Sequence, residues 1–473
     1  MELANAVAPL GEFLPDQNIL GGGLNTARNA VPIVGGYGPL KSFYSISSAL
    51  PATFAGGGSF VAAGGNTYML VGNSAGLDKY DGGTWTNLVT GMTVTGHWRF
   101  TQFGDYVVGV NGSLTKVTSL AGGAGTTTTL TDAPAGVCVA TVGDYVVIGQ
   151  AANDLTGIYT SGFNNHTDWD TVSGTATFQP MLEGGEVMGL ASGEYGVILQ
   201  RQRLVRMNVT GDATAPFSYD PITDNVGCAS KGSVCQAGRS VFFLSDRGFM
   251  ALDDGQAVRP IGSERVDRTF QARLPATDYE RIFSAVDPQK KLVYWMVPGA
   301  PSYVLIYNFA LDKWSEAEFS SDGLFPGFSS STGLETLAVS YPNLDAMMIS
   351  LDDPRWRGGA PAMYLVVSGE VGTFDGDNLP CTFEGSFAEY TPGRVSRFRS
   401  IRPITDSQTM GVTLDCRARL GDAANVTTAT SLRTSGIMPI RCSGRYTRFK
   451  WTDTGSWLFA QGLELEVEAG GER

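Results

Sequence analysis

The stretch Gly104-Asp-Tyr-Val-Val108 decides the fold, because it returns unchanged as Gly143-Asp-Tyr-Val-Val147, 39 residues further along the chain. Looser copies keep the same plan of a turn residue followed by a short apolar strand. They begin at Gly65, Gly193, Gly238, Lys290 and Asn343. Short runs of β-branched and aromatic residues bounded by Gly, Asn and Asp are typical of strands. A repeat of about 40–50 residues built only from strands predicts the blades of a β-propeller.

The seven copies predict an all-β fold whose main body is a propeller of about seven blades. A single blade leaves an apolar face uncovered, so neighbouring blades have to cover it and the ring closes on itself. Helical periodicity is confined to residues 263–274, where Val266, Phe270 and Leu274 lie four apart. A pair of β-sandwiches with accidental self-similarity is the alternative interpretation.

The chain divides into three parts. Residues 1–54 contain five prolines, which exclude long helices and central strands, so we expect an extended N-terminal arm, with disorder as the alternative. Residues 55–378 contain the strand repeat and form the predicted propeller. Residues 379–473 include runs such as 411–420 that alternate apolar and polar side chains, which is typical of antiparallel strands with one wet face. This last part is predicted to be a small C-terminal β-sandwich.

Composition and charge exclude several classes of protein. Gly contributes 61 of 473 residues without a period of three, which excludes collagen, and the aromatic content of 10% argues against disorder. No apolar run reaches the ~18 residues of a membrane helix, and no basic leader follows Met1, so we expect neither membrane insertion nor secretion. Residues 379–473 contain 12 basic and 10 acidic side chains, whereas residues 1–378 contain 21 and 36. Such an acidic body repels nucleic acid and anionic membranes.

Few residues have the spacing that catalysis or metal binding requires. His97 and His166, the two histidines, have no Cys, Asp or second His at metal-ligand spacing. No phosphate-binding, dinucleotide-binding or nucleophile-elbow motif occurs. We therefore expect no catalytic residue, no cofactor and no metal, and a protein that is not an enzyme. The cysteines are too sparse for a disulfide scaffold, which predicts buried thiols in a reducing compartment at Cys138, Cys228, Cys235, Cys381, Cys416 and Cys442.

Arginines cluster in two places. Arg201, Arg203 and Arg206 fall in a predicted strand of the propeller, where charge protects an exposed sheet edge from pairing. A second cluster, at the start of the C-terminal domain, comprises Arg394, Arg397, Arg399 and Arg402. We expect the second cluster to pair with the acidic surface of a neighbouring chain, with a phosphate site as the alternative.

Both ends of the chain carry motifs in a defined order. The N-terminal part contains Phe13-Leu-Pro-Asp16, then Asn29-Ala-Val-Pro-Ile33, then Gly36-Tyr-Gly-Pro39. The C-terminal part contains Gly444-Arg-Tyr-Thr-Arg-Phe-Lys-Trp451, followed by Trp457. In this order they resemble the tail hub or nozzle proteins of short-tailed bacteriophages, in which such an arm leads into a propeller. The resemblance implies a structural virion protein of the phage tail that is assembled in the host cytoplasm.

In that family the protein forms a hexameric ring below the portal and its adaptor, the head–tail connector protein. The resemblance therefore implies partners that include copies of this chain, the adaptor, and a tail fibre, spike or needle protein. Double-stranded DNA would pass through the channel during ejection without specific binding. An acidic lumen suits this role, because DNA carries about one negative charge per 1.7 Å and is not held by surfaces of like charge.

The N-terminal arm and the C-terminal sandwich are the predicted contacts of the ring, because a closed propeller has few free sheet edges. The candidate oligomer or partner contacts are Phe13, Asp16, Asn29, Pro32, Tyr37, Arg394, Arg397, Arg399, Arg402, Arg445 and Trp457. Two other functions are compatible with a propeller. One is a glycan-binding or glycan-cleaving protein that uses a central pocket. The other is a protein–protein scaffold, although the G-H…W-D signatures of that class are missing.

Overall fold

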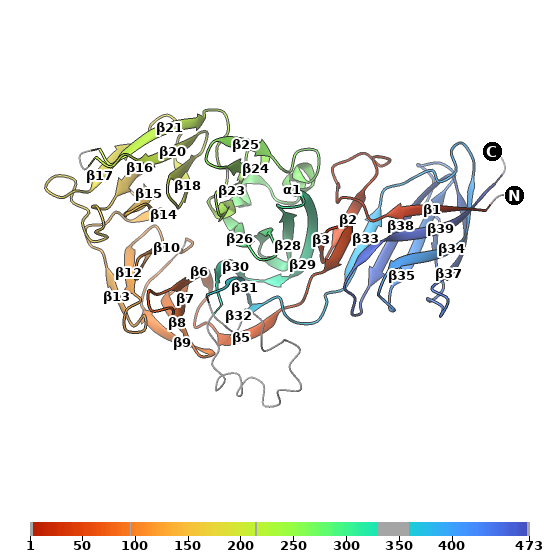
Figure 1. Ribbon diagram of the computed structural model, residues 1–473, viewed down its shortest axis with the longest axis horizontal. Coiled ribbons are helices and arrows are strands. Elements are labelled where there is room, and N and C mark those ends of the chain that lie inside the picture. The colour runs from red at the N-terminus through yellow and green to blue at the C-terminus, as the bar shows by residue number, and fades with distance from the viewer. Residues whose placement is uncertain (1–2, 95, 213–214, 330–358, 471–473) are drawn as a thin grey trace.

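The computed structural model of the chain describes residues 3–94, 96–212, 215–329 and 359–470. They form a ring of β-sheets with a β-sandwich attached at one side (Figure 1). Seven units of four antiparallel strands make up the ring. The predicted all-β fold with a propeller of about seven blades is therefore confirmed.

Consecutive strands build each of the first five blades. Blade 1 contains β6 (Phe54–Val61), β7 (Thr67–Asn73), β8 (Gly76–Asp81) and β9 (Thr84–Val89), and blade 2 contains β10 (Arg99–Phe103), β11 (Tyr106–Val110), β12 (Thr115–Ser119) and β13 (Thr126–Thr129). Blade 3 contains β14 (Gly136–Val142), β15 (Tyr145–Ala151), β16 (Asp154–Thr160) and β17 (Thr177–Pro180). Blade 4 contains β18 (Val187–Ala191), β19 (Gly196–Gln200), β20 (Leu204–Val209) and β21 (Phe217–Thr223). Blade 5 contains β22 (Cys235–Ala237), β23 (Ser240–Ser245), β24 (Gly248–Asp253) and β25 (Ala257–Pro260).

Glycine turns set the first hairpin of several blades. Gly104 and Gly143, which open the repeated stretch, each have a φ of 55°, and Gly238 has a φ of 60°. This left-handed conformation costs glycine nothing and strains other residues, so the repeated glycine marks a turn that the hairpin requires. Six of the seven copies found in the sequence lie just before the second strand of their blades, namely β7, β11, β15, β19, β23 and β27 (Leu292–Val297). The predicted copy at Asn343 lies outside the described residues.

Blade 7 closes the ring with strands from two distant parts of the chain. It contains β30 (Gly323–Phe328), β31 (Pro361–Val367), β32 (Glu370–Thr373) and β5 (Tyr44–Ala49). β5 pairs antiparallel with β32, from Glu370↔Ala49 to Thr373↔Tyr44. Because β5 leads directly into β6, this pairing ties the last blade to the first.

Blade 6 extends beyond the propeller into the sandwich. The blade itself contains β26 (Phe283–Asp287), β27, β28 (Gly299–Asn308) and β29 (Lys313–Ser321). The sheet then continues through β2 (Leu24–Arg28), β33 (Cys381–Gly385), β38 (Tyr446–Asp453), β35 (Gly411–Arg417) and β36 (Val426–Thr428). The second sheet of the sandwich contains β37 (Met438–Gly444), β34 (Ser396–Thr405), β39 (Ala460–Ala469), β1 (Leu3–Pro9), β4 (Gly36–Pro39) and β3 (Ala30–Ile33).

The N-terminal segment does not stand apart as the arm expected for residues 1–54. β1 pairs with β39 over seven residues, from Leu3↔Glu468 to Pro9↔Gly462, while β5 belongs to the propeller. Both parts of the fold therefore include strands from this segment, and residues 55 and 378 are not their outer limits. These pairings join residues several hundred positions apart, and local patterns in the sequence carry no information about them.

One helix lies between blades 5 and 6. α1 (Asp267–Arg273) falls within the predicted helical segment and is followed by a 3-10 helix (Ala276–Arg281); a shorter one (Lys231–Ser233) precedes blade 5. Phe270 of α1 is fully buried and packs on Phe249, with 4.9 Å between ring centroids. This contact belongs to a continuous apolar core that runs from blades 5 and 6 into the sandwich. Within the described ranges, no helix is long and apolar enough to cross a membrane.

Candidate functional site

The predicted aromatic contacts of the N-terminal segment are buried inside their own chain. Phe13 and Tyr37 are each 1% exposed. The Tyr37 hydroxyl donates a hydrogen bond to the Gly11 carbonyl at 3.0 Å, and its ring lies 5.2 Å from that of Phe383. Burial raises the pKa of Tyr37 well above its usual value. The expectation that these two side chains contact another chain is corrected, because both form part of the core.

Asp16 caps helix α1 from a distant part of the chain. Its carboxylate accepts hydrogen bonds from the N–H groups of Arg268 (2.7 Å) and Thr269 (2.8 Å) and from the Thr269 hydroxyl (2.7 Å). N–H groups of a first helical turn have no partner within the helix, and negative charge is favourable there. Asp267 lies beside this cap, is 7% exposed, and accepts a hydrogen bond from the Phe249 N–H at 3.1 Å. Burial, assisted by the charge of Asp16, raises the pKa of Asp267 to about 6.

Asn29 joins the N-terminal segment, blade 6 and the C-terminal domain. Its side-chain carbonyl accepts a hydrogen bond from the Glu318 N–H, and its amide donates to the Pro380 carbonyl, both at 2.9 Å. Its φ of 56° is a conformation that Asn adopts more readily than most residues. Nearby, the Pro32 carbonyl accepts a hydrogen bond from the Asn308 side chain of blade 6 at 3.0 Å. The observed contacts of Asn29 and Pro32 are thus made within the chain.

Four charged side chains form a cluster at the same junction. Glu316 of β29 is 2% exposed and lies 3.3 Å from an Arg28 guanidinium nitrogen and 3.5 Å from one of Arg273. Glu318 contacts the same two arginines, at 2.9 Å and 3.6 Å. Burial raises the pKa of Glu316, and the two guanidinium groups oppose that rise. The sequence analysis missed this cluster; the two glutamates spaced two apart in β29 were its only local signal.

The predicted arginine cluster of the C-terminal domain lies on β34 beside a row of glutamates on β39. Arg399 contacts Glu468 at 2.6 Å, and Arg402 lies 3.7 Å from Glu464. The two arginines are 56% and 57% exposed. Their expected acidic partners are therefore present within the chain, although both arginines still face solvent.

The other C-terminal candidates differ in exposure. Arg394 and Arg397 are exposed, and Arg445 is 3.1 Å from Glu389. Trp457, in contrast, is 2% exposed, and its indole nitrogen has no hydrogen-bond partner in the described part of the chain. The Trp457 side chain is therefore a core residue, which corrects its assignment as a contact to a partner.

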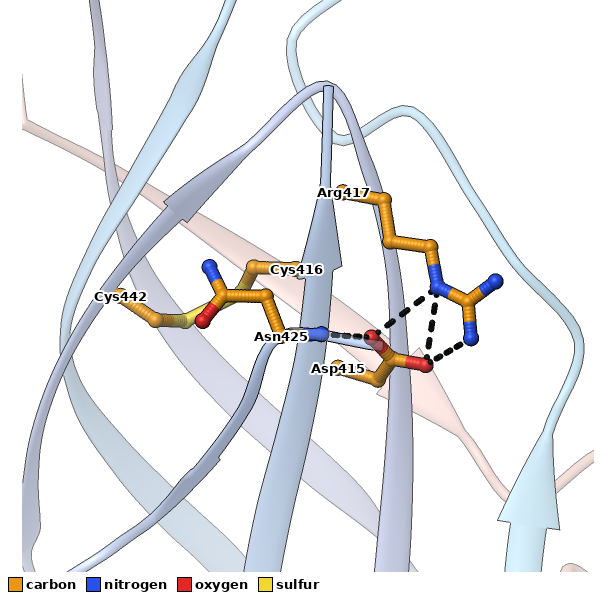
Figure 2. The surroundings of a disulfide bond; sticks show 5 residues. All are labelled: Asp415, Cys416, Arg417, Asn425 and Cys442. Carbon is orange, nitrogen blue, oxygen red and sulfur yellow. Dashed lines mark hydrogen bonds and ion pairs between the residues drawn. A yellow bond between two sulfur atoms is a disulfide. The ribbon is translucent and has the colours of Figure 1, made fainter. Parts of the chain in front are cut away.

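A disulfide connects the two sheets of the sandwich. Cys416 of β35 and Cys442 of β37 are bonded, with 6.4 Å between their Cα atoms (Figure 2). The prediction that all six cysteines are thiols is wrong for this pair, because the spacing of two cysteines does not reveal that their strands face each other. Asp415 lies beside the bond and accepts hydrogen bonds from the Arg417 side chain and from the Asn425 N–H. Burial opposes ionisation of Asp415, but these bonds hold its pKa below the usual value.

Packing accounts for both histidines. His97 Nε2 lies 3.0 Å from the Glu280 carbonyl oxygen, and His166 packs against Tyr106 with 4.1 Å between ring centroids. Burial lowers the pKa of both imidazoles. In the described residues, no three side chains of His, Cys, Asp or Glu are grouped as a metal site would require.

Two of the hollows on the described surface lie near residues discussed above. One, of about 280 Å³, lies between blades 4 and 5, and its wall includes Arg201, which pairs with Asp246 at 3.0 Å. The other, of about 540 Å³, lies beside β1 and is lined by Val7, Leu20 and Phe387 among others. The two carboxylates that line the first hollow, Asp224 and Asp246, form ion pairs with Arg203 and Arg201, and Glu389 lines the second hollow.

Comparisons with known proteins return similar structures but no related sequence. No family model and no curated protein matches the chain. The extracellular domain of a two-component system protein from B. thetaiotaomicron aligns with 83% of this chain at 12% identity and a TM-score of 0.41; the alignment covers 46% of that protein, about half its length. The WD40 domain of Pan2 from Neurospora crassa aligns with 61% of this chain and 89% of its own, at 8% identity and a TM-score of 0.37. At this level of similarity, no function transfers to the chain.

Proposed function

We propose that the protein is a structural subunit of the tail hub or nozzle of a short-tailed bacteriophage. In this role six copies form a ring below the portal and its adaptor, continue the DNA exit channel, and offer sites to a fibre, spike or needle protein. Double-stranded DNA passes through the ring without specific binding. The subunit assembles in the host cytoplasm and resides in the tail of the virion.

One observation carries the proposal: residues of the motifs that resemble this family connect the N-terminal segment to the propeller, as Asp16 and Asn29 do, or pack in the sandwich core, as Tyr37 does. Asp16 caps α1, Asn29 bridges blade 6 and Pro380, and Tyr37 lies in the core beside Phe383. A ring closes only if every subunit presents its two contact surfaces at the same angle. Fixing the sandwich on the propeller meets that requirement, so the resemblance and the packing support the same role.

The charge of the chain supports the proposed passage of DNA. Residues 1–378 contain 36 acidic and 21 basic side chains, and this part includes every blade. A surface with this excess of carboxylates repels phosphates within about one Debye length, ~8 Å at physiological salt. DNA next to such a wall stays mobile, whereas a basic wall would exchange counterions for tight phosphate contacts.

The proposal is tested by the mass of the purified protein, alone and mixed with a portal–adaptor complex. Light scattering should give a particle of about six times 50.2 kDa, either free or added to the adaptor, and negative-stain images should show a ring. Portal without adaptor is the matched control. A chain that stays monomeric and ignores the adaptor would contradict the proposal, and glycan binding would then be measured. Deleting residues 1–40 is not a useful test, because this removes β1 to β4 from the fold.

A further inference from the structure

The molecule is elongated, and its two ends differ in charge. Figure 1 shows the sandwich at one end of the molecule and blade 3 at the other, with other blades of the propeller between them. Blades 3 and 4, Gly136–Thr223, contain nine acidic and three basic residues. Residues 379–473 instead contain 12 basic and 10 acidic residues. The distal blades are therefore strongly negative, whereas residues 379–473, which provide the C-terminal strands of the sandwich, are slightly positive.

The acidic end also exposes large apolar side chains around β17, the outermost strand of blade 3. These are Leu155 (50% exposed), Val172 (94%), Phe178 (40%) and Leu182 (77%), which we call the blade-3 rim. β17 pairs with β16 on one side and has no strand on its other side among the described residues. Exposed apolar side chains beside a free strand edge make a surface that soluble proteins usually cover.

The opposite end carries exposed arginines on the outer sheet of the sandwich. Arg397 of β34 and Arg441 of β37 are exposed and form no ion pair within the described ranges. Arg399 and Arg402 lie on the same strand and keep more than half of their side chains in solvent. Val7 of β1, 58% exposed, lies in register with Glu464, which in turn is in register with Arg402. We call Val7, Arg397, Arg399, Arg402 and Arg441 the sandwich face.

We propose that the sandwich face of one copy binds the blade-3 rim of the next copy. The arginines of the sandwich face are complementary in charge to the acidic blades that carry the rim, which guides and orients association, and Val7 adds an exposed apolar group to the face. Because the two surfaces lie at opposite ends of the folded molecule, the contact is head-to-tail. Such contacts build closed rings or open filaments. This inference rests on the proposed function and deepens it by naming the contact between subunits of the ring. The charges and the exposed side chains of the two surfaces support it.

Two variants, each with one surface disabled, test the contact. The face variant is Arg397→Glu with Arg441→Glu, and the rim variant is Val172→Lys with Leu182→Lys. All four side chains are exposed, so both variants should fold, which circular dichroism checks. The controls are Arg247→Glu with Arg419→Glu for the face and Leu114→Lys for the rim, at exposed positions outside both surfaces.

Sedimentation velocity at low ionic strength measures the assembly of each protein, both alone and mixed with the adaptor. Wild type and controls should assemble, and salt should weaken the assembly because exposed charges are screened. Each variant alone should lose affinity by at least about tenfold, since like charges now face each other. A mixture of the two variants should associate again, because the intact face of the rim variant can bind the intact rim of the face variant and the exchanged charges of the two altered surfaces are also complementary.

Three outcomes overturn the contact: a wild type that is monomeric both alone and on the adaptor, variants that assemble like wild type, or a mixture that does not associate. Failure of the contact and failure of the proposed function are distinguishable. If either variant still formed rings on the adaptor, the proposed contact would be wrong and the proposed tail role would stand. If the protein assembled head-to-tail but did not bind the adaptor, the proposed contact would stand and the proposed tail role would be wrong.

Discussion

Replacing Asp267 by Asn should stabilise the protein at neutral pH and leave its stability unchanged in acid. Burial raises the folded-state pKa of Asp267 to about 6, against an ordinary value of 3.8. A raised carboxyl pKa means that the folded state binds the proton more tightly than the unfolded state. The resulting stabilisation is complete below pH 3.8 and is lost as the pH rises through about 6. A shift of about two units corresponds to about 3 kcal/mol at most.

The contacts of Asp267 suggest that Asn can replace it without loss of packing. The carboxylate accepts one hydrogen bond from the Phe249 N–H, and an Asn side-chain carbonyl can accept the same bond. Asn stays neutral at every pH, so it avoids burying a charge above pH 6. Urea unfolding followed by tryptophan fluorescence at pH 4 and pH 7.5 measures the effect. We expect a gain of about 1–3 kcal/mol at the higher pH and almost none at the lower.

Two further variants show whether the reasoning about this site is right. Asp254→Asn, at an exposed position of a turn with a φ of 51°, is the control and should change neither curve by more than ~0.5 kcal/mol. Asp16→Asn removes a charge that helps to raise the pKa of Asp267, so the pH dependence should move towards lower pH. The reasoning is refuted if Asp267→Asn is no more stable than wild type at pH 7.5, or if its gain is the same at both pH values.

Three other predictions concern the sandwich, its junction with the propeller and the packing between blades. Reducing the Cys416–Cys442 disulfide should destabilise the sandwich by about 3.5 kcal/mol, because the bond closes a 26-residue loop; calorimetry with and without reductant measures this, and the double Ser variant should not respond to reductant. Asn29→Ala should cost about 2–4 kcal/mol by removing two hydrogen bonds and straining a φ of 56°, whereas Asn29→Gly avoids the strain and should cost less in urea titrations. Gly232→Ala should lower Tm sharply, because its Cβ would overlap the Ile282 carbonyl oxygen; an unchanged Tm would contradict the backbone position.

The sequence predicted the parts of the fold that depend on residues close together in the chain. Each turn glycine of the repeat needs a left-handed φ, so Gly104 and Gly143 recur at a fixed distance from the strand that follows them. The alternation of Val412, Leu414 and Cys416 likewise reports which side of β35 is buried. Each signal comes from residues that are close together in the chain, within one turn or one strand. A single sequence is therefore enough to detect it.

The candidate site was harder to predict because its contacts join distant residues. The motif drew attention to Asp16 and Asn29, but their partners, such as Thr269 and Glu318, lie more than 200 positions away. An extended, proline-containing segment is equally compatible with contacts to its own chain or to another chain. Only the register of β1 on β39 and of β5 on β32 distinguishes these cases. Local patterns do not encode such a register, because each pair joins strands more than 300 positions apart in the chain.

The same long-range pairings give a reason for the order in which the proposed ring surfaces form. The sandwich face includes Val7 of β1 and Arg397 of β34, two strands that both pair with β39. The face is therefore absent until β39 has joined the sheet, and blade 7 is incomplete until β5 has found β32. Contacts of such high sequence separation form slowly, because the loop between them has to close first. A chain with an incomplete fold would thus lack the sandwich face, and head-to-tail assembly would select subunits whose propeller and sandwich are already joined.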